Sequence, residues 1–151
     1  VVYVDGPHGH FIVDGRTFSG ILMIGGGIGV APMIGIIREM VEANDLRPVK
    51  LLYGNRTLSQ IAFREELQEA SKSINLDVNF ALSDAPKDWP DHKGNIDEVL
   101  IEKTLQSIDK PEDWLYLLCG PPAMLDYNVE ILISNGIKKH QIEYEKFSYL
   151  S

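Results

Sequence analysis

The sequence predicts an α/β fold in which a doubly wound, five-stranded parallel sheet of order 3-2-1-4-5 carries helices on both faces. Two observations predict it. Short apolar runs alternate with longer segments whose apolar residues recur at helical spacing, and glycine or proline separates them. Such alternation is typical of parallel strands joined by right-handed helical crossovers. The 151 residues, of which 44% are hydrophobic and 24% charged, suffice for one domain of ordinary globular composition.

The first strand and the first helix meet at a glycine-rich turn. Residues 21–24 are an apolar run that glycines end, which is typical of a buried parallel strand. Pro32 stands where the first turn of a helix tolerates proline, so we expect a helix from there to about Ala43. Residues 20–37 carry no charge, but their six glycines and Pro32 disfavour a transmembrane helix.

The later elements repeat this pattern. The segments expected to be strands are residues 49–54, 76–82, 114–119 and 141–149. The segments expected to be helices are residues 58–73, residues 95–105, and a last one that Pro121 and Pro122 open and Asn135-Gly136 ends. In the first of these helices the spacing predicts four buried residues, Ile61, Phe63, Leu67 and Ala70. Residues 83–94, rich in Asp, Pro, Lys and Gly, are expected to form a loop.

The first eighteen residues stand outside the alternation. A strand over residues 1–5, a turn over 6–9 and a short strand over 11–13 indicate the edge of a different, β-rich domain. We place the linker around Thr17 to Gly20. Because the chain opens directly in a strand, we expect it to be a piece of a longer protein.

The net charge and the cysteine content limit which partners, metal sites and cellular locations are expected. Lysine and arginine number 14 against 22 aspartates and glutamates, so the formal net charge is −8. An acidic chain without a basic tract binds phosphate backbones poorly, so no nucleic acid is expected as a partner. The single cysteine, Cys119, excludes an intramolecular disulfide and a multi-cysteine zinc site, and it favours a reducing, cytoplasmic location. The four histidines lack companion cysteines or carboxylate clusters, so no metal site is expected.

Glycines crowd the turn between the first strand and the first helix, at residues 25–29. Glycine lets the backbone approach a pyrophosphate, and the free N–H groups of a helix start favour an anion. The turn departs from the G-x-G-x-x-G fingerprint, because Pro32 occupies the place of the last glycine and no acid follows about 20 residues later to hold a ribose. A dinucleotide or phosphate site is therefore indicated, and a classical NAD dehydrogenase is disfavoured. A tight turn without a ligand stays the alternative.

A second strand-to-helix junction, at residues 119–122, is expected beside the first. In the predicted strand order the first and fourth strands are neighbours whose connections leave in opposite directions, and ligands bind at such a switch point. The two junctions would therefore form the two sides of one crevice. The alternative for Cys119 is a small buried residue that ends a strand.

Four motifs occur in the order and spacing of a known family. They are Gly6-Pro7-x-Gly9-x-Phe11, Gly26-Gly27-x-Gly29-x-x-Pro32, Tyr53-Gly54-Asn55-Arg56-Thr57 and Cys119-Gly120-Pro121-Pro122. Together they resemble the nicotinamide-binding half of the ferredoxin–NADP reductase superfamily. The loop Ala85-Pro86-x-x-Trp89 and the segment Asn55-x-Thr57 are most similar to its cytochrome b5 reductase and nitrate reductase branch.

The resemblance covers nearly the whole chain and implies two parts. Residues 1–18 would be the last piece of a flavin-binding β-barrel, and residues 19–151 would be the NAD(P)-binding domain. The Arg-x-Tyr-Ser/Thr motif of that barrel does not occur in this sequence. FAD would therefore belong to a preceding domain.

The resemblance also implies which residues bind the coenzyme. Those expected around the pyrophosphate are Gly26, Gly27, Ile28, Gly29 and Pro32. Those expected beside the adenosine ribose are Asn55, Arg56, Thr57, Ser83 and Asp84. The second junction would contribute Gly120, Pro121, Pro122 and Met124. Cys119 would lie near C4 of the nicotinamide, and Glu145 and Phe147 would face the flavin ring.

These expectations predict the NAD(P)H-binding module of a flavin-dependent oxidoreductase. It would deliver hydride to FAD on the flavin-binding domain of the same polypeptide, and electrons would pass on to a haem, an iron–sulfur centre or a small molecule. The isolated chain would be inactive. The alternative is a non-catalytic domain that senses a dinucleotide and controls a partner. A membrane domain elsewhere in the protein would place the module on the cytoplasmic face of that membrane.

The residues favour NADPH over NADH as the coenzyme. No Asp or Glu follows the second strand, so nothing there repels a 2′-phosphate, and Arg56 could pair with one through its planar guanidinium. Ser83 stands where NADH-using relatives in the cytochrome b5 reductase branch carry an acid. Asp84 argues the other way, but alternation along the strand end puts Ser83 and Asp84 on opposite sides. We expect Ser83 to face the ribose.

Overall fold

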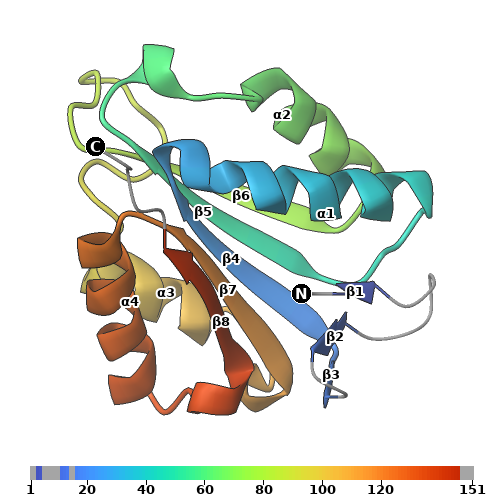
Figure 1. Ribbon diagram of the computed structural model, residues 1–151. Coiled ribbons are helices and arrows are strands. Elements are labelled where there is room, and N and C mark those ends of the chain that lie inside the picture. Colours follow the sequence, from blue (N-terminus) through green and yellow to red (C-terminus); the bar gives the residue numbers. More distant parts are fainter. Residues whose placement is uncertain (1–2, 5–10, 14–15, 147–151) are drawn as a thin grey trace.

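A five-stranded parallel sheet forms the centre of the molecule (Figure 1). The computed structural model describes residues 3–4, 11–13 and 16–146. The strands of this sheet are β4 (Gly20–Gly26), β5 (Val49–Asn55), β6 (Leu76–Leu82), β7 (Trp114–Gly120) and β8 (Ile142–Lys146). They lie in the order β6-β5-β4-β7-β8, which is 3-2-1-4-5 when β4 is counted as the first strand. The predicted fold class is confirmed.

Helices cover both faces of the sheet (Figure 1). One face carries α1 (Ala31–Glu42) and α2 (Arg64–Ser73), and the other carries α3 (Glu98–Gln106) and α4 (Pro122–Ser134). Short 3-10 turns complete the connections; they are η1 (Gly27–Val30), η2 (Leu58–Gln60), η3 (Pro111–Asp113) and η4 (Lys139–Gln141).

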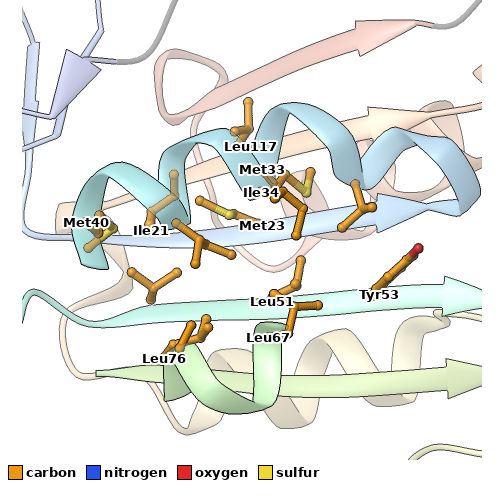
Figure 2. Packing of buried hydrophobic residues seen from close by; sticks show 14 of the residues in the cluster. Ile21, Met23, Met33, Ile34, Met40, Leu51, Tyr53, Leu67, Leu76 and Leu117 are labelled. Atoms are coloured by element: carbon orange, nitrogen blue, oxygen red, sulfur yellow. The ribbon is translucent and has the colours of Figure 1, made fainter. Parts of the chain in front are cut away.

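Alternate residues of the central strand belong to two separate cores, because successive side chains of a strand point to opposite faces. Ile21 and Met23 of β4 pack with α1 and α2, whereas Leu22 and Ile24 pack with α3 and α4. Figure 2 shows the first of these cores, with side chains of α1 and α2 against those of β4, β5 and β6. Strand β4 is thus buried on both faces, which explains its unbroken apolar run.

A three-stranded antiparallel sheet precedes the parallel one. It consists of β1 (Tyr3–Val4), β2 (Phe11–Val13) and β3 (Arg16–Phe18). The sequence does not predict β3, which takes up the first half of the expected linker, so that Ser19 alone separates β3 from β4. The N–H of Ser19 donates to the carbonyl of Asp113 (2.9 Å), which ties this connection to the start of β7. The expected turn at residues 6–9 lies outside the described residues.

The second helix is shorter than the sequence predicts. The expectation of one helix over residues 58–73 is wrong, because the turn η2 comes first and α2 begins only at Arg64. Phe63, just before α2, adopts a left-handed backbone conformation (φ 58°), which cannot continue a helix. Its side chain is 42% exposed rather than buried. The other apolar residues that were expected to face the core are at least partly buried.

The remaining boundaries differ by a few residues. Helix α3 begins at Glu98 rather than at residue 95, because the Asp97 side chain caps it by accepting a hydrogen bond from the N–H of Leu100 (2.9 Å). Strand β8 is described to Lys146, and the rest of the expected strand lies outside the described residues. None of the helices described is long and apolar enough to cross a membrane.

Candidate functional site

The turn between β4 and α1 packs directly onto the end of β7. Gly25 and Cys119 are partners in the parallel register of β4 and β7. A Cβ on Gly29 would lie 2.7 Å from the carbonyl carbon of Cys119 and 3.0 Å from the nitrogen of Gly120. Only glycine therefore lets η1 lie against β7. The two junctions that the sequence predicts as neighbours are in contact.

The start of η1 and α1 is suited to an anion. No side chain in the described part of the chain caps either element, and no acid occupies their first turns. Gly27 has φ 55°, and a Cβ there would meet no described atom within 4 Å, so space lies open beside the turn. The first N–H groups of a helix lack intrahelical acceptors and attract negative charge. Pro32 lies in the first turn of α1, where its missing N–H removes no helical hydrogen bond.

A cleft of about 780 Å³ opens at the carboxyl ends of the strands, between them and the starts of α3 and α4. Many residues that the sequence singles out line it: Gly26, Gly27, Ile28, Asn55, Arg56, Ser83, Pro121 and Met124. Met124 reaches across to the glycine turn, because a Cβ on Gly26 or on Gly120 would lie 2.6 Å from its side chain. The cleft thus lies at the switch point between β4 and β7, where doubly wound sheets bind ligands.

The connection after β6 presents Ser83 to the cleft and leaves Asp84 outside it. The N–H of Ser83 donates to the carbonyl of Asn55 (3.1 Å), and the N–H of Asp84 donates to that of Arg56 (2.8 Å). These bonds tie the end of β6 to the end of β5. The exposed side chain of Arg56 makes no ion pair or hydrogen bond with the part of the chain that the structure describes. It is available to an anion in the cleft.

A smaller hollow of about 490 Å³ adjoins the cleft, and the two share residues of the glycine turn and of the end of β5. The exposed ring of Phe63 forms part of its wall, and the guanidinium carbon of Arg38 lies 5.6 Å from the ring centre. The hydroxyl of Tyr53 accepts a hydrogen bond from the N–H of Ala62 (3.2 Å), which holds this segment to β5. An exposed aromatic ring can stack on a planar base. Sequence reasoning missed this surface because helical spacing predicts a buried Phe63.

Another wall of the cleft was also missed. Asn95, Ile96 and Asp97, just before α3, line it together with Tyr127 of α4. Ile96 packs against the end of β5, since a Cβ on Gly54 would lie 3.3 Å from its Cδ1. One signal was present in the sequence, because an aspartate before an apolar-periodic segment is a typical helix N-cap. A helix start that follows the third strand falls at the carboxyl edge of the sheet, where the ligand site is expected.

Several expected site residues line neither hollow; they are Gly29, Pro32, Thr57, Asp84, Cys119, Gly120 and Pro122. Gly29 and Gly120 instead bring backbone segments together, as described above. Thr57 closes the turn at η2, where its N–H donates to the side-chain oxygen of Gln60 (3.2 Å). Gly29 and Gly120 thus shape the site through close backbone packing rather than by lining it.

Of the three residues expected near the reacting groups, the structure describes two, Cys119 and Glu145, near the carboxyl ends of β7 and β8. Cys119 is 1% exposed and belongs to the same buried cluster as Val30 and Met33, in keeping with a small residue that ends a strand. Glu145 of β8 is the register partner of Cys119. Phe147 lies outside the described residues.

The groups that line the cleft and the adjoining hollow can bind a ligand with phosphate and ring parts, although one carboxylate is among them. Among the described residues that line the cleft, Arg56 is the guanidinium and Asp97 the carboxylate. No group of three or more histidines, cysteines, aspartates or glutamates in the described part of the chain could hold a metal ion. The geometry therefore offers backbone N–H groups and one cation for phosphates, and apolar and aromatic surfaces for rings.

A comparison with known families identifies the fold. A model of the oxidoreductase NAD-binding domain matches residues 23–130, a span that runs from β4 into α4 and contains both junctions. The chain belongs to this family. Together with its structural neighbours, the match makes it an NAD-binding domain of the ferredoxin–NADP reductase superfamily.

Individual relatives support the same family assignment. The chain is 33% identical, over 97% of its length, to one subunit of the Na⁺-translocating NADH-quinone reductase of Psychrobacter cryohalolentis, and it covers 36% of that subunit. The cytochrome b5 reductase domain of Ulva prolifera nitrate reductase superposes with a TM-score of 0.80 at 26% identity, covering 95% of this chain and 55% of that one. The flavohemoglobin of Malassezia yamatoensis, solved with bound FAD and heme, gives 0.74 at 29% identity, covering 87% and 32%. The chain thus spans between about a third and about half of these proteins.

Proposed function

We propose that this domain binds NAD(P)H and delivers hydride to FAD held by a preceding domain of the same polypeptide, from which electrons pass to a haem, an iron–sulfur centre or a small molecule. The observation that carries the proposal is the contact of the two junctions, where Gly29 lies against Cys119 and Gly120 and one cleft opens beside them. An NADH-quinone reductase and a flavohemoglobin with bound FAD among the relatives support it. We place the boundary with the flavin-binding domain after residue 18.

The residues present fit a dinucleotide. The uncapped start of η1, with open space beside Gly27, would take the pyrophosphate. Asn55 and Arg56 would lie beside the adenosine ribose, and the ring of Phe63 in the adjoining hollow would stack on the base. When bound, nicotinamide and flavin supply the hydride chemistry. The side chains of this domain bind and orient the donor and exclude water from the cleft.

We assign Cys119 to the nicotinamide end of the cleft, and Glu145 and Phe147 to the side that would face the flavin ring. The register supports this for Cys119 and Glu145, which are paired at the carboxyl ends of β7 and β8, next to Gly25 at the glycine turn. Cys119 is 1% exposed in this chain, so its contact with the nicotinamide would require that binding of the coenzyme uncovers the sulfur. Its position would then align the donor with the flavin.

We further propose that the coenzyme is NADPH. Ser83 lines the cleft and Asp84 does not, so the wall beside the ribose carries a hydroxyl where a carboxylate would repel a 2′-phosphate. Arg56, which directly follows β5, lines the same cleft and is available for a bidentate pair with the phosphate.

Titration of both coenzymes against wild type and Arg56→Ala tests the proposed function and the coenzyme together. We expect NADPH to protect the wild type against thermal unfolding, and Arg56→Ala to weaken NADPH binding by roughly 1.5–3 kcal/mol, the scale of a charged hydrogen bond, while NADH binding is nearly unchanged. Arg16→Ala is the matched control, because Arg16 lies on β3 and lines neither hollow. Equal losses for the two coenzymes would contradict the choice of NADPH. A wild type that neither coenzyme protects would contradict the function.

A further inference from the structure

His92 contacts residues 95–97, the wall of the cleft that contains none of the four motifs. Its Nε2 lies 3.0 Å from the carbonyl oxygen of Asn95 and 3.5 Å from Oδ1 of Asp97. A backbone carbonyl can only accept, so Nε2 carries the proton and donates it to the carbonyl of Asn95. The side chain of His92 is 19% exposed, whereas that of Asp97 is 41% exposed and lines the cleft. The imidazole therefore stands behind the wall that the ligand would meet.

The fold fixes the position of this imidazole. The long loop after β6 returns to the strand it left, because the N–H of Leu82 donates to the carbonyl of His92 (3.1 Å) and the N–H of Gly94 donates to the carbonyl of Leu82 (2.7 Å). Trp89 anchors the middle of the loop, since it is buried and its Nε1 donates to the carbonyl of Phe80 (3.1 Å). The backbone of His92 is thus held at the carboxyl edge of the sheet.

Asp97 poses an electrostatic problem for an anionic ligand. It is the carboxylate among the described residues lining the cleft, and a carboxylate beside phosphates is unfavourable. Its Oδ1 is already engaged, because it accepts the hydrogen bond from Leu100 that begins α3. The N–H side of the His92 ring lies 3.5 Å from the same oxygen, so its positive end partly offsets the negative charge beside the cleft.

We propose that His92 is a positioning residue for the coenzyme: it holds the segment 95–97 in place through its hydrogen bond to the Asn95 carbonyl and turns its N–H side toward the Asp97 carboxylate, so that this wall accepts an anionic dinucleotide. The proposal rests on the proposed function. It makes the affinity for the coenzyme, and not the rate of hydride transfer at saturation, depend on His92, since the imidazole lies behind the wall.

A double-mutant cycle in coenzyme binding tests it. We expect His92→Ala to raise the dissociation constants of NADPH and NADH about three- to tenfold, the scale of one hydrogen bond, and His92→Gln, which restores a donor, to recover most of the loss. Asp97→Asn removes the charge and keeps a good helix cap. In that background His92→Ala should cost less than half as much in free energy. His140→Ala is the control, because His140 lies on η4 and lines neither hollow.

Two results would overturn the inference: unchanged affinity in His92→Ala, or an equal loss from His92→Ala with and without the Asp97 carboxylate. If His92→Ala is less stable than the wild type but binds the coenzymes with normal affinity at low temperature, that result counts as unchanged affinity. A wild type that binds neither coenzyme contradicts the proposed function instead, so the two failures are distinguishable.

Discussion

Gly26, Gly27 and Gly29 serve three different purposes within one turn. Gly26 leaves room for the side chain of Met124, Gly27 adopts a positive φ beside open space, and Gly29 touches the backbone of β7. The sequence identifies the turn through its glycines, but it suggests one common reason, the approach of a pyrophosphate. The contacts with Met124 and β7 come from residues far along the chain, so no local pattern could reveal them.

The close contact of Gly29 makes alanine there costly. We expect Gly29→Ala to lower the free energy of unfolding by about 3 kcal/mol, because backbone atoms of Cys119 and Gly120 cannot move aside as a flexible side chain would. Gly35→Ala in α1 is the matched control; its new Cβ meets no described atom within 4 Å, and alanine favours a helix, so stability should rise by roughly 0.5–1 kcal/mol. Urea unfolding measures both. A Gly29→Ala variant as stable as the wild type would show that η1 does not lie against β7.

At the scale of elements, strands were predicted more accurately than the segment before α2. The apolar runs of β4 to β7 end at glycines or polar residues, so their bounds follow from local sequence. Residues 58–73 also show helical spacing, but Phe63, just before α2, adopts a left-handed conformation that aromatic residues rarely adopt, and this interrupts the expected helix. The spacing of apolar residues does not reveal the backbone conformation of a single residue. The ring of Phe63 is therefore exposed and belongs to the candidate site, whereas the spacing predicts it in the core.

Helix α4 carries a polar side chain, Asn128, on its buried side. Asn128 is 0% exposed, and neither its amide nitrogen nor its oxygen has a hydrogen-bond partner in the part of the chain that the structure describes. A buried amide without partners costs about 1–3 kcal/mol, so Asn128→Leu, of similar size, should raise the free energy of unfolding by that amount. Asn135→Leu is the control and should destabilise slightly, because the Asn135 side chain donates to the carbonyl of Ile131 (2.9 Å). Denaturant unfolding that shows a loss of stability for Asn128→Leu would mean that the amide has a partner, such as an internal water.

At the scale of the whole molecule, the carboxyl and amino edges of the parallel sheet differ in what they carry. The carboxyl ends of β4 to β7 carry the cleft, with its tight glycine contacts and its available guanidinium, Arg56. The motifs at this end made half of the site predictable from sequence. The wall at residues 95–97 was not, because a loop without a motif brings it there through backbone hydrogen bonds to Leu82. At the amino ends, polar side chains tie the connections to the strands.

Among these polar side chains near the amino ends of the strands, Tyr116 is an ionisable one. Its hydroxyl donates to the carbonyl of Pro111 (2.9 Å), which also accepts from the side chain of Gln141 (2.9 Å). Burial, reinforced by the negative charge of Glu112, raises the pKa of Tyr116 above the ordinary value. The folded state therefore favours the neutral phenol. Its contribution to stability is fully present below about pH 10, the pKa in the unfolded chain, and is lost progressively above it, by at most about 1.4 kcal/mol per pH unit.

The variant Tyr116→Phe separates this contribution from the site. At pH 8 it should be less stable than the wild type by roughly 0.5–1.5 kcal/mol, because one hydrogen bond is lost while Pro111 keeps its bond from Gln141. Above pH 10 the difference should shrink and then reverse, since only the wild type has this phenol to ionise on unfolding. Coenzyme affinity at pH 8 should be unchanged, because Tyr116 lines neither hollow. Urea midpoints between pH 8 and 11 decide the matter: parallel curves for the two proteins would mean that Tyr116 ionises as readily in the folded chain as in the unfolded one.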